Sequence, residues 1–135
     1  MQNQENENRM GYSRILKFRA WDKISKSMHE VGALNFSDET VGFEVRLAAK
    51  GTFGYSERFT NVILMQYTGL KDKNGKEIFC KDILSHPDVP NSEFYVRWNN
   101  ERARFQLESK EGKELMGQLF DNEYFIIGNE YEGIA

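Results

Sequence analysis

The chain has 135 residues, of which 39% are hydrophobic and 29% charged, and its net charge is −3 at pH 7. This length and composition are typical of one globular domain that buries its core without disulfides or metals. The balanced charge excludes a strongly basic nucleic-acid-binding domain, and no segment approaches the roughly 18 consecutive apolar residues that a transmembrane helix needs.

The N-terminal segment differs in composition from the rest of the chain. Residues 1–11 are rich in Asn, Gln and Glu and contain no apolar segment of the kind that a signal peptide requires. We therefore expect residues 1–11 to be a disordered lead-in and residues 12–135 to form a single β-rich domain. The one cysteine, Cys80, cannot form an internal disulfide, which indicates a reducing compartment and favours a cytoplasmic location without a membrane partner.

Alternation of apolar and polar residues predicts most of the β-strands. In the clearest case Val41, Phe43, Val45 and Leu47 point one way while the residues between them point the other. Weaker or shorter patterns of the same kind occur at residues 16–20, 31–36, 94–98 and 103–107. A short polar stretch, residues 99–102, suits a turn between the last two segments. This hairpin would bring Trp98 close to Phe105, and we expect both rings to be largely buried.

Two short runs are apolar on both faces, residues 62–65 and 124–127, and they are expected to be central buried strands. The one helix candidate is residues 111–120, weakened by Gly112 and Gly117. Without a long amphipathic helix, the expected fold is mainly β, or β-rich α+β at most. It would be a small antiparallel barrel or sheet with at most one short helix.

The densest turn signal lies in residues 68–78. Asn74-Gly75 has the composition of a two-residue type I′ hairpin turn. Around it, Lys71, Lys73, Lys76 and Lys81 form a candidate anion-binding edge, although Asp72 and Glu77 dilute its charge. The alternative is an ordinary hairpin whose lysines protect its tip.

No pattern in the chain indicates a catalytic, metal or cofactor site. The glycines of residues 69–76 have the wrong spacing for a phosphate-binding loop, and they precede a strand instead of a helix. Cys80 has apolar neighbours, and no spacing joins it to a base or a metal site with His29, His86 or Asp82. Scattered carboxylates near the C-terminus, including Glu130, and arginines such as Arg97 suggest a mixed solvated surface, or two patches that meet within the fold or between subunits.

Three segments together resemble the YopX family of phage and prophage proteins. They are Ile15–Lys23, Leu64–Ile78 with the following Asp82-Ile83, and Ile127–Tyr131. The resemblance implies a mainly β architecture with SH3-like features in the C-terminal half and a phage or prophage origin, and it implies no activity. Where family members usually have an acidic residue and glycine before Asp-Ile, this chain has Cys80 and Lys81, so Lys81 makes any turn that the glycine permits, or the turn is not made at all. The candidate interaction and motif residues are Trp21, Gln66, Tyr67, Gly69, Lys71, Lys73, Lys76, Asp82 and Asn129.

The expected function is therefore that of a non-enzymatic accessory protein of a phage or prophage. It would act in the host cytoplasm as a homo-oligomer that binds a host or phage macromolecule, with no cofactor or metal. The first alternative is a nucleic-acid-associated module that uses the lysine hairpin and the aromatic strands. The second is an enzyme whose site the sequence does not reveal.

Overall fold

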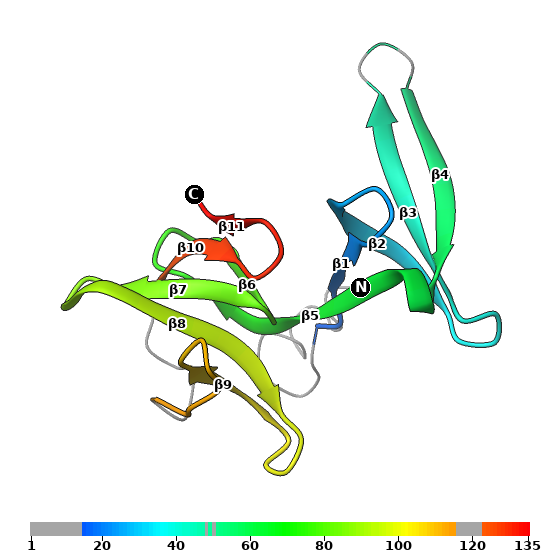
Figure 1. Ribbon diagram of the computed structural model, residues 1–135. Helices are drawn as coiled ribbons and strands as arrows, with labels where there is room; N and C mark the ends of the chain where they lie inside the picture. The colour runs from blue at the N-terminus through cyan, green and yellow to red at the C-terminus, as the bar shows by residue number, and fades with distance from the viewer. Residues whose placement is uncertain (1–14, 48, 50, 116–122) are drawn as a thin grey trace, which may run out of the picture. The chain divides into compact units, whose positions relative to one another are not determined.

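A computed structural model describes residues 15–47, 49, 51–115 and 123–135 (Figure 1). The predicted lead-in, residues 1–11, lies outside them. The contacts divide the chain into two compact units, Lys17–Gln66 and one that contains Tyr67–Ala135. Each unit is described by itself, and the single domain expected from the sequence stays a prediction.

The unit Lys17–Gln66 is one antiparallel sheet. Its elements are β1 (Phe18–Asp22), β2 (Ser27–Asn35), β3 (Thr40–Leu47), β4 (Gly51–Arg58), the 3-10 turn η2 (Phe59–Asn61) and the first half of β5 (Val62–Lys71). The strands lie in the order β4-β3-β2-β1-β5. Ala20, Val41, Phe43 and Val62 form its buried core. The predicted apolar face is therefore buried at Ala20, Val41 and Phe43, but Leu16 precedes β1 and is exposed, and β4 was not predicted.

The unit that contains Tyr67–Ala135 is built on a second antiparallel sheet. The second half of β5 pairs with β6 (Glu77–Phe79). The sheet itself consists of β7 (Asp82–His86), β8 (Val89–Asn99), β9 (Arg104–Glu108), β10 (Phe125–Asn129) and β11 (Gly133–Ile134), in the order β11-β10-β7-β8-β9. Strands β7, β8 and β9 are consecutive and β10 returns to lie beside β7, which is the strand order of a Greek key.

The core of this second unit includes residues that alternation predicted, but the β8–β9 hairpin differs from the prediction. Its buried residues are Ile78, Leu84, Phe94, Val96, Leu107 and Tyr124. Trp98 lies opposite Phe105 as predicted, but the expectation that it is largely buried is wrong, because 41% of it is exposed. Trp98 lies near the end of β8 and is not part of the buried core that contains Phe94 and Val96. Alternation therefore predicts which face of the strand Trp98 is on, but not whether it is buried.

Two further expectations for this hairpin are wrong. In the alternating pattern of residues 103–107, Gln106 lies between Phe105 and Leu107 and would face solvent, but it is buried, with its side chain hydrogen-bonded to Asn99 and Glu108. Ala103 was assigned to the second strand, but it has φ +51° and belongs to the turn before β9. A buried polar residue with satisfied hydrogen bonds looks like a surface residue to a pattern based on hydrophobicity.

The remaining segments agree with a mainly β protein. Residues 111–115 are not helical, and the rest of the predicted helix, residues 116–120, lies outside the described part of the chain. Strand β10 lies inside the sheet between β7 and β11, but most of its residues are only half-buried. Apart from short 3-10 turns, the described residues are strands, turns and loops, so the expected fold class is confirmed. The described residues form no helix long and apolar enough to cross a bilayer.

Candidate interaction surfaces

The lysine hairpin between β5 and β6 turns one residue earlier than predicted. The Gly75 N–H donates to the Asp72 carbonyl oxygen over 2.9 Å, which centres the turn on Lys73 and Asn74. Gly75 has φ +81°, whereas Asn74 does not have a positive φ. The type I′ assignment is therefore wrong. The sequence identified the hairpin and its left-handed glycine, but the position of the turn depends on Asp72.

Asp72 is a buried acceptor that holds this turn together. Its Oδ1 accepts hydrogen bonds from the N–H groups of Asn74 and Lys76, each over 2.9 Å, and its Oδ2 accepts one from Ile126 N–H over 3.0 Å. Burial alone would raise the pKa of this carboxyl, but the three backbone donors outweigh burial and hold the pKa below its ordinary value. The carboxylate therefore fastens the hairpin to β10 and is directed away from solvent.

The lysines of the hairpin remain on the surface. Lys71, Lys73 and Lys76 are exposed, and the ammonium of Lys73 lies 5.3 Å from the centre of the Phe125 ring. Asp72 is buried between them, and its carboxylate still interacts electrostatically with Lys76. Glu77, which pairs with Lys71 across the strands, is half-buried. The hairpin tip thus presents mainly positive groups to solvent.

Lys81 makes a turn with a left-handed backbone conformation. It connects β6 to β7 with φ +76°, its N–H donates to Val96 C=O over 2.7 Å, and its C=O accepts from Glu130 N–H over 2.9 Å. Next to it, the buried Asp82 accepts a hydrogen bond from Phe79 N–H over 2.8 Å and so closes the same connection. The Asp-Ile motif therefore has a structural role here.

The C-terminal motif also forms a turn. Asn129 Oδ1 accepts from the N–H groups of Tyr131 and Glu132, and its amide nitrogen donates to Glu132 Oε1. A Cβ atom on Gly128 would clash with the backbone of Gly133 and of Ile134, its partner in the β10–β11 pair. This close approach of two backbones explains the glycine in the motif.

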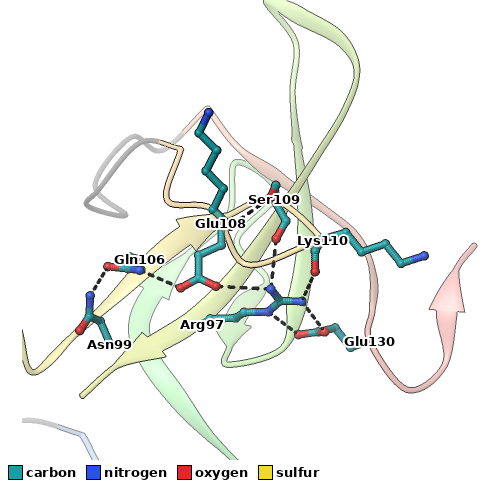
Figure 2. A network of polar contacts seen from close by, with 8 residues as sticks. Arg97, Asn99, Gln106, Glu108, Ser109, Lys110 and Glu130 are labelled. Carbon is teal, nitrogen blue, oxygen red and sulfur yellow. Dashed lines mark hydrogen bonds and ion pairs between the residues drawn. The ribbon is translucent and has the colours of Figure 1, made fainter. Parts of the chain in front are cut away.

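Arg97 lies at the centre of a polar network in this unit (Figure 2). Its guanidinium donates to both carboxylate oxygens of Glu130, over 2.8 and 3.2 Å, and to Glu108 over 3.3 Å. It also donates to the carbonyl oxygens of Ser109 and Lys110, over 3.1 Å each. These five contacts match the five N–H donors of a guanidinium. The ion pair with Glu130 raises the pKa of Arg97 further.

This network was only partly anticipated. The arginine-rich hairpin and the acidic C-terminal stretch do meet within the fold through Arg97 and Glu130, and Arg104 pairs with Glu114 over 2.7 Å. The interpretation as a merely solvated surface is therefore wrong for these pairs. The network joins the 108–110 segment to the C-terminal turn. Because all five donors of Arg97 are engaged, its guanidinium has none left for an external anion.

Trp98 and Phe105 form an aromatic pair in which Trp98 is exposed and Phe105 is half-buried. Their ring centres lie 5.0 Å apart in an edge-to-face arrangement. The pair lies beside the 99–103 turn, in which Arg102 is exposed. Aromatic rings of this kind supply a large contact area at low entropic cost. We call Trp98, Phe105 and Arg102 the aromatic platform.

Cys80 and the histidines have other partners. Cys80 is half-buried, and burial raises the pKa of its thiol above 9.0 more than neighbouring Lys81 lowers it. The ring of His86 packs against Tyr124, with ring centres 4.8 Å apart, and its Nδ1 accepts from Asp88 N–H. In the other unit, His29 Nε2 lies 2.7 Å from Ser27 Oγ and 3.1 Å from the Tyr55 hydroxyl. The described residues contain no group of three or more side chains placed to hold a metal ion.

The remaining candidate residues are distributed over β1 and β5. Trp21 is half-buried on β1, opposite Met28 and Ile63, and Gln66 is half-buried opposite Phe18. Tyr67 is buried against Phe79, with ring centres 5.6 Å apart. Gly69 has φ +90° where the β5–β6 register shifts. A functional role for these residues stays a prediction, while Tyr67 and Gly69 clearly shape the fold.

The motif segments span most of the chain, and so does the match to a known protein family. The family model described as YopX protein matches residues 17–133. The chain belongs to the YopX family. No curated protein matches it significantly. Among solved structures, the crystal structure of protein EF1440 from Enterococcus faecalis is similar. It has 28% sequence identity and a TM-score of 0.60, and the match covers 89% of this chain and 96% of that one.

Proposed function

We propose that this YopX protein is a non-enzymatic accessory protein of a phage or prophage that binds a macromolecule and associates with copies of itself. The observation that carries the proposal is the aromatic platform, in which 41% of Trp98 is exposed while its ring packs edge-to-face on Phe105. Exposed Trp and Arg side chains are the types that dominate binding energy at protein interfaces. Phe105 holds the indole in place, so less side-chain entropy would be lost on binding.

The charge of the unit favours a protein partner over a nucleic acid. Residues 67–135 contain nine Lys and Arg and 13 Asp and Glu, which gives a net charge of −4. Nucleic-acid-binding domains usually carry a net positive charge that neutralises phosphates. Because the unit that carries the aromatic platform is acidic overall, we infer that the partner is a protein.

The experiment compares capture of host proteins by three forms of the chain. Wild type, Trp98→Ala and Val89→Ala are immobilised and exposed to host lysate with and without nuclease. Val89 lies on the same strand and is 49% exposed, so its variant controls for lost apolar surface. A protein retained by wild type and Val89→Ala, lost with Trp98→Ala and insensitive to nuclease supports the proposal. Equal retention by all three forms contradicts it.

A nucleic-acid role is the second candidate, and one observation favours it. Three exposed lysines occupy the hairpin tip while Asp72 between them is buried. Binding through this tip would weaken with rising salt as phosphate counterions are released. A Lys71→Gln/Lys73→Gln/Lys76→Gln variant would then lose affinity for single-stranded DNA or RNA in a titration at low salt. The Trp98→Ala variant would show whether base stacking contributes to the affinity in addition to charge. No salt-dependent binding by wild type would exclude this role.

A further inference from the structure

The outer part of the β3–β4 hairpin is only two strands wide. The β2–β3 pairing reaches Val31 opposite Phe43, whereas β3 and β4 pair through eight residues, as far as Leu47 opposite Gly51. Among the described residues, no third strand pairs with residues 44–47 and 51–54, which we call the hairpin arm. Figure 1 shows β3 and β4 continuing together past β2. A two-stranded ribbon is at best marginally stable in water, so the arm is expected to gain stability from a partner.

Strand β4 is also a long edge without the usual protection. It is the last strand of its sheet and pairs with β3 in an unbroken register. Residues 51–58 contain no proline and no lysine, the residues that commonly block edge pairing. By contrast, β11 has two residues, and the edge of β9 is covered in part by a hydrogen bond from Leu115 N–H to Leu107 C=O.

The face of the sheet next to this edge leaves room for another backbone. Small residues, Gly32, Ala33, Gly42, Gly54 and Ser56, line a shallow hollow of about 650 Å³. A Cβ on Gly54 would meet only the carbonyl oxygen of Phe43, at 3.5 Å, and Gly54 itself is exposed. Phe43, Tyr55 and the exposed Glu44, which lies opposite Gly54, complete the lining of the hollow.

We propose that the β4 edges of two copies of this chain pair antiparallel across a two-fold axis. This inference rests on the self-association part of the proposed function and assigns it to a surface. Antiparallel pairing of identical strands is self-complementary and closes on itself. Residues 51–58 contain one Glu and one Arg, so two copies do not repel. Facing residues must lie on the same side of the sheet, so pairing centred on Gly54 places Glu57 opposite Gly51. Pairing centred on Tyr55 places Arg58 opposite Thr52. Neither brings like charges together.

The first test measures the mass of the full chain by sedimentation over a range of concentrations. Gly54→Lys introduces a positive charge near the axis, and its side chain has room to fit. Ala33→Lys adds the same charge on the same face of β2 and is the matched control. We expect wild type and Ala33→Lys to associate and Gly54→Lys to dissociate, with a dissociation constant at least about tenfold higher. If wild type is monomeric, the self-association part of the proposed function fails; if wild type and Gly54→Lys associate equally, only the assignment to β4 fails.

The second test locates the axis by disulfide cross-linking. In a Cys80→Ser background, Gly54→Cys and Ser56→Cys are oxidised separately and as a mixture. A disulfide needs Cα atoms within about 7 Å. Cross-linking of Gly54→Cys alone therefore places the axis at residue 54, and cross-linking of Ser56→Cys alone places it at residue 56. Cross-linking in the mixture only places the axis at residue 55. Ala33→Cys is the control and should not cross-link. Efficient cross-linking at 33, or none at 54 and 56 in an oligomeric protein, would overturn the proposal.

Discussion

Lys81 adopts a backbone conformation that favours glycine. It has φ +76°, and both of its backbone groups are fixed, the N–H to Val96 and the C=O by Glu130. The turn therefore cannot relax to a negative φ without breaking two hydrogen bonds. A left-handed conformation costs a non-glycine residue about 1–2 kcal/mol, and this chain retains it because β6, β7 and the C-terminal turn determine the position.

Lys81→Gly is therefore expected to stabilise the protein. We expect a gain of about 0.5–1 kcal/mol, because relief of the left-handed strain exceeds the added entropy of the unfolded chain. The measurement is urea unfolding at neutral pH, with Lys76→Gly as the control. Lys76 is exposed and does not have a positive φ, so its replacement should lower stability. A loss of stability with Lys81→Gly would show that the lysine side chain matters more than its backbone.

At the scale of the element, Asp72 makes the lysine hairpin part of the sheet. Asp72→Asn replaces an acceptor oxygen with a donor that faces backbone N–H groups, and it removes the charge from three hydrogen bonds. We expect a loss of about 1–3 kcal/mol at neutral pH. Asp88→Asn, at an exposed carboxylate, should change stability by less than about 0.5 kcal/mol.

The pH dependence of this loss has a defined sign. The folded-state pKa of Asp72 lies below its ordinary value of 3.8. Its contribution is therefore present above the ordinary pKa and lost as the pH falls through the folded-state pKa. The difference in unfolding free energy between wild type and Asp72→Asn should shrink on acidification below about pH 4. Urea unfolding at several pH values measures it, and a difference that grows in acid would contradict this role.

Period-two alternation predicted elements better than it predicted burial. It found the strands around Val41 and Val96 because one face of each is packed. It missed β4, whose residues 51–58 include two glycines and two charged residues. It also misplaced Gln106 and Trp98, because the first is buried by hydrogen bonds and the second lies at a strand end. Tertiary hydrogen bonds such as those of Asp72 and Arg97 join distant segments, and no local pattern reveals them.

For the whole molecule, the family motifs explain the fold more than they reveal a site. Asp82, Gly128 and Asn129 each fix a connection or a close backbone contact. The side chains of Asp82 and Asn129 make hydrogen bonds within the chain, so these motif residues have a structural role. The aromatic platform and the β4 edge lie outside the motif segments, whereas the lysine hairpin lies within residues 64–78. Sequence resemblance therefore gave the architecture correctly and left function to the geometry.

The last prediction concerns the cooperativity of the whole chain. Strand β5 pairs with β1 through residues 62–66 and with β6 from Tyr67 onward, so each of the two units uses one half of a continuous strand. Loss of either unit removes support from this strand. We therefore expect residues 12–135 to unfold in one transition, as a single domain does.

The chain offers one tryptophan in each unit as a probe, Trp21 in β1 and Trp98 in β8. Trp98→Phe leaves Trp21 to report on the first unit, and Trp21→Phe leaves Trp98 to report on the second. Circular dichroism of each variant controls for a change in overall stability. Urea unfolding followed by fluorescence should give the same midpoint as circular dichroism in each variant, because one cooperative transition is seen alike by every probe. Fluorescence midpoints that separate from the circular dichroism curve in opposite directions would mean that the two units unfold independently.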